Sequence, residues 1–110
     1  MCNVRIIENF FESVNLITKH RDIGPMLKLL DEDLHGTDLY GQPIRNRKEL
    51  LDRYKVLPGN CLIIGSNLII GSTDVTAHFE ILSENQTLWL KGMIEFSLEH
   101  GRIKSINVAS

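Results

Sequence analysis

The sequence has little cysteine and no long apolar run. Its only two cysteines, Cys2 and Cys61, are too far apart to indicate a disulfide framework or a zinc motif, so we expect two free thiols, with Cys61 in the core. No segment approaches the roughly eighteen consecutive apolar residues of a membrane-spanning helix. Residues 1–5 also lack the basic start and apolar run of a secretion signal. These absences predict a cytoplasmic protein that does not enter a membrane.

An excess of one charge is also lacking. The chain has 12 basic and 14 acidic residues, a formal net charge of -2, so it does not carry the basic surplus that attracts nucleic acid. The histidines show no metal-ligand spacing: they are His20, His35, His78 and His100. We therefore expect no nucleic-acid partner, no metal and no other cofactor.

The first half of the chain carries helical signals. Apolar residues at the spacing of one buried helical face predict a helix over 4–20; they are Ile7, Phe10, Phe11, Val14 and Ile17. Asp22 predicts the N-cap of a second helix, which should end before the acidic residues 31–33 because the helix dipole disfavours acids there. Asn46 followed by Glu49 predicts a capped third helix.

The second half of the chain carries strand signals. Strands are predicted over 61–70, 75–82, 87–98 and 102–108, with turns between them. Gly65 predicts either a bulge in one long strand or a hairpin. A chain of 110 residues with 43% apolar content buries a single core, so residues 1–110 are predicted to form one domain. Helices followed by strands predict an α+β fold, with three helices packed on a curved antiparallel sheet.

Alternation along two of these strands predicts one apolar and one mixed sheet face. The mixed face should carry Trp89 and Met93 together with His78. Large apolar side chains among polar ones suit an interface better than open solvent. We therefore expect a homodimer that forms through this face of the sheet.

Residues 38–45, with the sequence DLYGQPIR, contain the most informative carboxylate. Asp38 ends a short extended segment just before a Gly/Pro turn that leads into a helix. Such an acid can point into a core, where desolvation disfavours its charged form and prepares it to act as a general base near neutral pH. The alternative is a turn residue, because Asp often bonds to the backbone two residues on.

Together with residues 21–23 (RDI) and 100–103 (HGRI), this segment resembles ketosteroid isomerases and the SnoaL-like polyketide cyclases of the nuclear transport factor 2-like (NTF2-like) superfamily. The resemblance covers about residues 5–108. It implies a cone of helices and curved sheet around an apolar interior that binds a small hydrophobic molecule. It also implies that Asp38 removes a proton next to a carbonyl and that Tyr54 is a pocket tyrosine.

Two positions depart from the resembled enzymes. Val14 stands where their oxyanion-hole tyrosine is expected, and Gly92 where their protonated acid is expected. Loss of one such donor typically slows catalysis by about a hundred- to a thousandfold. Two functions stay open. One is a cofactor-free isomerase or cyclase with Asp38 and Tyr54 as catalytic residues, and the other is a non-catalytic ligand-binding or dimerisation module. In either case the expected pocket lining is Phe10, Val14, Tyr40, Phe79, Gly92, Ile94 and Phe96.

Overall fold

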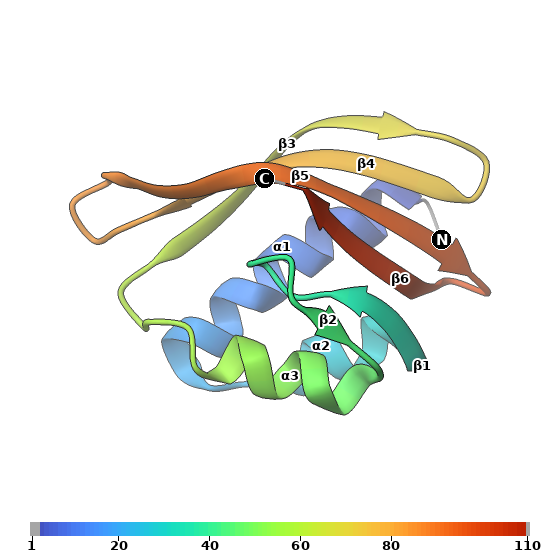
Figure 1. Ribbon diagram of the computed structural model, residues 1–110, viewed down its shortest axis with the longest axis horizontal. Helices are drawn as coiled ribbons and strands as arrows, with labels where there is room; N and C mark the ends of the chain where they lie inside the picture. Colours follow the sequence, from blue (N-terminus) through green and yellow to red (C-terminus); the bar gives the residue numbers. More distant parts are fainter. Residues whose placement is uncertain (1–2, 110) are drawn as a thin grey trace.

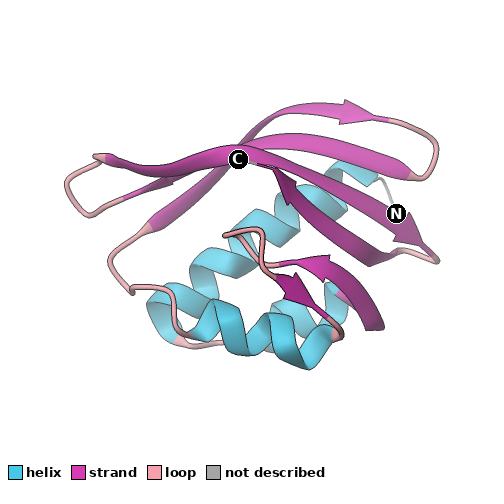
Figure 2. Cartoon of the chain, viewed as in Figure 1, coloured by secondary structure: helices cyan, strands magenta, loops and turns pink. Residues whose placement is uncertain are grey.

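The computed structural model describes residues 3–109, a range that excludes Cys2. Within it no helix is long and apolar enough to cross a membrane. The elements follow in the order α1 (Asn3–His20), α2 (Gly24–Leu29), β1 (Leu30–Thr37), β2 (Pro43–Ile44), α3 (Arg47–Lys55), β3 (Leu62–Ile70), β4 (Asp74–Leu82), β5 (Leu88–Glu99) and β6 (Arg102–Ala109). Figure 2 shows the helices, in cyan, gathered on one side of the long strands.

The first helix, α1, forms as its apolar spacing predicts. Its buried stripe faces the sheet, and its last turn carries Lys19 and His20, whose positive character suits the C-terminal end of the helix dipole. The helix ends at His20, and the next residue, Arg21, has a φ of 56° and donates its N–H to the carbonyl of Ile17 at 2.9 Å. This left-handed residue redirects the chain into α2.

The second helix begins later than predicted and ends before the acidic residues 31–33, as predicted. It begins at Gly24 with Ile23 as N-cap, while the Asp22 carboxylate accepts from the Gly24 N–H at 3.0 Å and closes the turn before the helix. It ends at Leu29 and continues directly into β1, so the acidic residues 31–33 lie in a strand. Burial of Leu30 and Leu34 outweighs the low strand preference of those acids.

The sheet is mixed, which corrects the prediction of a purely antiparallel one. Its strand order is β2-β1-β6-β5-β4-β3, and every neighbouring pair is antiparallel except β1 and β6, which run parallel. The rest of the chain between β1 and β6 serves as the long crossover that a parallel pair requires. Figure 1 shows this open, curved sheet arching over the helices. The predicted α+β class is confirmed.

The glycine in β3 has a packing role. The strand is continuous from Leu62 to Ile70, and its bulge lies between Ser66 and Ile69, where Asn67 has a φ of 52°. Gly65 itself lies against the Phe11 ring, which would overlap any Cβ placed there. Residues 62–70 therefore form one long bulged strand and not a hairpin, but the bulge follows Ser66 and does not lie at Gly65 as predicted.

The concave side of the sheet is filled by the protein's own side chains. The Phe10 ring meets the Phe96 ring edge-on at 5.0 Å between centroids and the Tyr54 ring at 6.2 Å. All residues of this group are fully buried, namely Phe10, Val14, Tyr54, Phe79, Ile94 and Phe96. In this structure these residues form the core on which the helices pack.

Candidate functional site

The turn after β1 is organised by Asp38. Its Oδ1 accepts hydrogen bonds from the backbone N–H groups of Tyr40 and Gln42, each at 2.9 Å. Its own N–H donates to the Gln42 carbonyl, and its carbonyl accepts from Gly41. Gly41 has a φ of 79°, a conformation that glycine adopts without strain. The turn holds the carboxylate inward, with only 6% of the side chain exposed.

The second oxygen of this carboxylate binds Arg53. Nη1 of Arg53 donates to Oδ2 of Asp38 at 2.7 Å, and 43% of the arginine side chain stays exposed. No motif in the sequence singles out Arg53. The two residues lie 15 positions apart on different elements, so no local pattern indicates the pair.

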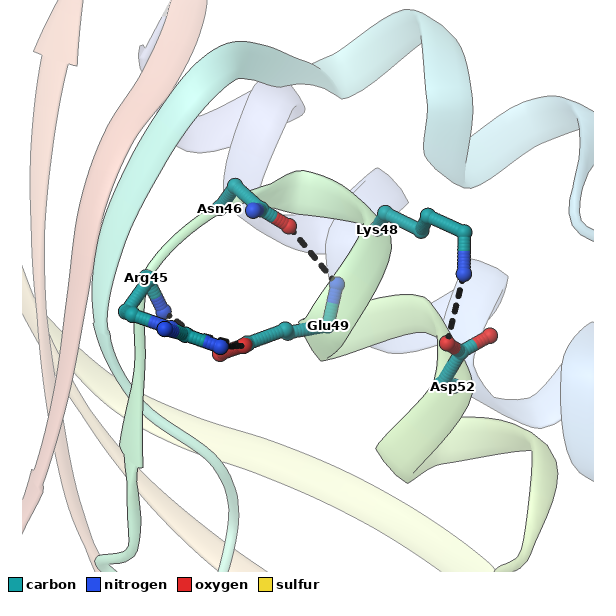
Figure 3. Close-up of polar contacts among 5 residues, drawn as sticks. All are labelled: Arg45, Asn46, Lys48, Glu49 and Asp52. Atoms are coloured by element: carbon teal, nitrogen blue, oxygen red, sulfur yellow. Dashed lines mark hydrogen bonds and ion pairs between the residues drawn. The ribbon is translucent and has the colours of Figure 1, made fainter.

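The start of α3 fixes the helix that carries Arg53 and Tyr54. Asn46 Oδ1 accepts from the Glu49 N–H at 3.0 Å, which confirms the predicted cap. The Glu49 carboxylate reaches back one residue further than a capping box requires and accepts from the backbone N–H and from Nε of Arg45, each at 2.9 Å. Figure 3 shows both contacts. Satisfied N–H groups at this end make α3 a firm base for the site.

The Tyr54 hydroxyl is buried and has no hydrogen-bond partner among the described residues. Burial raises the pKa of Tyr54 well above its ordinary value, and the charge of Asp38 raises it further, so the phenol is a neutral donor. Unpartnered buried hydroxyls are rare in folded proteins. Tyr54 lines a cavity of about 60 Å³ together with Asp38, Leu39, Tyr40, Arg53, Val56 and Leu57.

Exposed apolar side chains surround this cavity, and we call Tyr40, Val56 and Trp89 the mouth. They are 50%, 79% and 47% exposed, respectively. The rings of Tyr40 and Trp89 meet edge-on at 6.3 Å between centroids. Tyr40 and Val56 line the cavity itself. The mouth therefore offers a ligand an apolar surface directly beside the cavity that Asp38 and Tyr54 line.

A bulge in β5 determines the position of Trp89. The pairing with β4 shifts between Ile81 and Leu82, which leaves Trp89 as the extra residue. Its side chain borders a depression of about 260 Å³ with Pro58, Asn60, Cys61 and Ser83. Simple alternation had placed Trp89 beside His78 and Met93, and that placement is wrong.

Cys61 is a free, buried thiol, as expected. It donates to the Pro58 carbonyl at 3.0 Å. Burial raises the pKa of the Cys61 thiol, so the thiol is uncharged at neutral pH. Within residues 3–109 no cluster of three His, Cys, Asp or Glu side chains is placed to hold a metal ion.

The structure brings together only part of the expected site. Asp38, Tyr40 and Tyr54 line one cavity. The predicted lining residues Phe10, Val14, Ile94 and Phe96 belong to the core. Gly92 pairs with Phe79, and both border a groove of about 530 Å³ that also contains His78 and Met93. Neither Val14 nor Gly92 brings a polar side chain to the cavity.

No protein-family model and no curated protein matches this sequence. Solved structures match almost all of it. An NTF2-like protein of unknown function from Cytophaga hutchinsonii aligns with a TM-score of 0.79 at 15% identity, over 99% of this chain and 89% of that one. This chain has the NTF2-like fold. The predicted resemblance to the NTF2-like superfamily is confirmed at the level of the fold.

Other structures with the NTF2-like fold are classed as enzymes. One from Jannaschia sp. CCS1, classed as a SnoaL-like polyketide cyclase, aligns with a TM-score of 0.77 at 10% identity, over 97% of this chain and 83% of that one. Another from Kribbella flavida, classed as a ketosteroid isomerase, aligns with a TM-score of 0.75 at 17% identity, over 94% and 73%. At such identities function has to be argued from the site's own residues.

Proposed function

We propose that this NTF2-like chain binds a small hydrophobic carbonyl compound at the Asp38 turn and acts on it as a cofactor-free isomerase or cyclase. One observation carries the proposal: Tyr54, whose buried hydroxyl has no partner within residues 3–109, and Asp38 line the same cavity. The phenol is a neutral donor suited to a carbonyl oxygen. The carboxylate is an acceptor suited to the proton on the neighbouring carbon.

The sizes of the cavity and the mouth indicate how such a ligand would lie. About 60 Å³ accommodates a carbonyl group, whereas whole ligands commonly occupy pockets of about 300 Å³ or more. The apolar body of the ligand would therefore rest outside the cavity, against the mouth residues Tyr40, Val56 and Trp89. Exposed apolar clusters of this kind are typical of binding sites.

Lone pairs single out one oxygen of Asp38 as the proton acceptor. Oδ1 already accepts from two backbone N–H groups, while Oδ2 accepts only from Arg53 and keeps a lone pair free. In the proposed step a C–H bond next to the carbonyl breaks and its proton moves to Oδ2. The electron pair moves to the carbonyl oxygen and forms an enolate. Isomerisation returns the proton from Oδ2 at another carbon. Cyclisation uses the enolate carbon to attack a second carbonyl carbon of the same molecule, whose C=O π bond breaks and whose oxygen takes the proton back from Oδ2.

A non-catalytic ligand-binding module is the second candidate. The observation that favours it is the same set of hydrogen bonds on Asp38, because bonds from Tyr40 and Gln42 are those of an ordinary Asp turn. In that case Tyr54 would still hold the ligand oxygen, and no proton would be transferred.

Solvent exchange of a simple ketone separates the two candidates. The probe is 2-tetralone, an apolar bicyclic ketone, whose α-protons are followed by NMR in deuterated water. Binding is followed by fluorescence of Trp89, the single tryptophan of the chain. We expect the protein to bind 2-tetralone and to accelerate the exchange, and Asp38→Asn to lose about a hundredfold or more of that acceleration.

A matched control is Asp33→Asn, which changes an exposed acid of β1 outside the cavity and should leave exchange unaltered. Binding without accelerated exchange would establish the non-catalytic candidate. A protein that neither binds nor exchanges the ketone would refute both.

A further inference from the structure

Two side chains with hydrogen-bond donors in the cavity lining, those of Arg53 and Tyr54, come from α3. The two family positions expected to supply oxyanion donors hold Val14 and Gly92, whose side chains offer none. Arg53 and Tyr54, adjacent on α3, both line the cavity. Tyr54 is fully buried with its ring against Phe10, whereas Arg53 is nearly half exposed at the edge. One donor is therefore fixed, and the other has room to move.

The contact between Arg53 and Asp38 leaves other N–H donors of the Arg53 guanidinium available to a ligand oxygen. It joins Nη1 to Oδ2 at 2.7 Å, a single contact. A guanidinium carries several N–H donors in a planar fork that matches oxygen anions. Arg53 and Tyr54 both line the cavity, so their side chains are the two candidate donors to a ligand oxygen placed there.

Charge conservation connects this geometry to the proposed reaction. Before proton transfer, the negative charge of Asp38 is balanced by Arg53. After Oδ2 takes the proton, Asp38 is neutral and the negative charge resides on the enolate oxygen of the ligand. The net charge of the site is unchanged by the transfer, and Arg53 is then free to pair with that oxygen. Such pairing stabilises the charge that develops during the reaction.

We infer that Arg53 is the oxyanion-binding catalytic residue of this site, and that it exchanges Asp38 for the enolate oxygen as the proton moves to Asp38. Tyr54 is the second donor to the same oxygen. This inference rests on the proposed function. The substrate class is then a carbonyl compound whose oxygen becomes negatively charged during the reaction. Asp38 has two roles, as the proton acceptor and as the initial partner of Arg53.

The test uses 2-naphthol, which in its ionised form resembles the enolate of 2-tetralone. In the Asp38→Asn variant a neutral amide replaces the carboxylate and imitates the protonated acid. Arg53 then has no ion pair with residue 38 and can contact the ligand oxygen. Absorbance and fluorescence distinguish neutral from ionised 2-naphthol. We expect Asp38→Asn to raise the ionisation constant of bound 2-naphthol about tenfold or more over that of the free compound, because a nearby cation favours the anion.

The decisive variant is Asp38→Asn/Arg53→Met, which should bind 2-naphthol without this increase. Asp38→Asn/Lys48→Met is its matched control, because Lys48 is a cation of the same helix that points away from the cavity to pair with Asp52. It should keep the increase. Removing the Asp38 carboxylate in all three proteins avoids leaving a buried charge unpaired, which would threaten folding.

Exchange of 2-tetralone provides the second measurement. Arg53→Lys keeps a positive charge beside Asp38 and removes the planar fork, so it should slow exchange about a hundredfold. Two results together would overturn the inference. One is that Arg53→Lys exchanges 2-tetralone as fast as the wild type, and the other is that Asp38→Asn and Asp38→Asn/Arg53→Met give bound 2-naphthol the same ionisation constant. The proposed function would still stand, because the wild type exchanges the ketone. If the wild type neither binds nor exchanges 2-tetralone, the inference and the proposed function are both wrong.

Discussion

The pair of Asp38 and Arg53 shows why a carboxylate can be buried in this turn. Two backbone N–H groups and a guanidinium satisfy oxygens that are almost inaccessible to water. Sequence reasoning placed Asp38 inward, and its burial follows that expectation. It did not find Arg53, because the partner is chosen by the packing of α3 against the turn.

Arg53→Met should lower the free energy of unfolding by about 1–3 kcal/mol, because Asp38 loses its charged donor while staying buried. Lys48→Met removes a cation of the same helix from an exposed pair with Asp52 and should cost less than about 1 kcal/mol. Urea denaturation measures both. Equal losses in the two variants would show that the Asp38 pair contributes no more than a surface pair.

The Tyr54 hydroxyl makes a sharper residue-scale prediction. Tyr54→Phe removes a buried hydroxyl without a partner, so the folded protein should be as stable as before or up to about 1 kcal/mol more stable. Its affinity for 2-naphthol should nevertheless fall. A loss of stability well above that range in urea denaturation would mean that the hydroxyl has a structural bond.

Stability above neutral pH gives an independent test of the same group. Burial raises the pKa of Tyr54 above its ordinary value of 10.0. The unfolded chain releases this proton near the ordinary value while the folded chain retains it, so stability present below pH 10 is lost as the pH rises further. Urea denaturation across this range should show a smaller loss for Tyr54→Phe. Identical curves for both proteins would contradict the assigned environment.

At the scale of elements, local signals predicted what local physics determines. The stripe of α1, the Asn46 cap and the alternation of β4 and β5 each depend on residues near one another in sequence, and each is found in the structure. Two features depend on distant partners and were not predicted. β1 pairs in parallel with β6 at Leu30 and again at His35 and Gly36, so residues 31–33 lie within a strand. The bulge in β5 turned Trp89 toward the mouth.

Gly65 in β3 permits the close approach of α1. Gly65→Ala should destabilise the fold by about 1–3 kcal/mol, because the added methyl overlaps the Phe11 ring. Combining it with Phe11→Leu, which replaces the ring by a smaller side chain, should cost less than the sum of the two single changes. Simple additivity in urea denaturation would show that the ring does not limit this position.

At the scale of the whole molecule, one face of the sheet lies opposite the helices. His78 pairs with Met93 across β4 and β5, and both border the groove of about 530 Å³. Met93 is a large apolar side chain left exposed on this face. We propose that the chain forms a homodimer through this face, with the corrected position of Trp89 outside the interface.

Met93→Glu should therefore convert the dimer to a monomer, because it places charge at the apolar centre of the contact. Trp89→Glu should keep the dimeric mass while weakening the binding of 2-tetralone at the mouth. Light scattering at tens of micromolar protein gives both masses. A monomeric wild type, or a monomer caused by Trp89→Glu alone, would contradict this assignment of faces.

The central claim is that one ligand carbonyl enters the cavity shared by Tyr54 and Asp38. Its most direct test is the carbon-13 NMR signal of carbonyl-labelled 2-tetralone bound to the protein. Hydrogen bonding polarises a carbonyl and moves this signal downfield, so we expect a downfield signal with the wild type and a smaller shift with Tyr54→Phe. Identical bound signals for the two proteins would show that the carbonyl lies elsewhere.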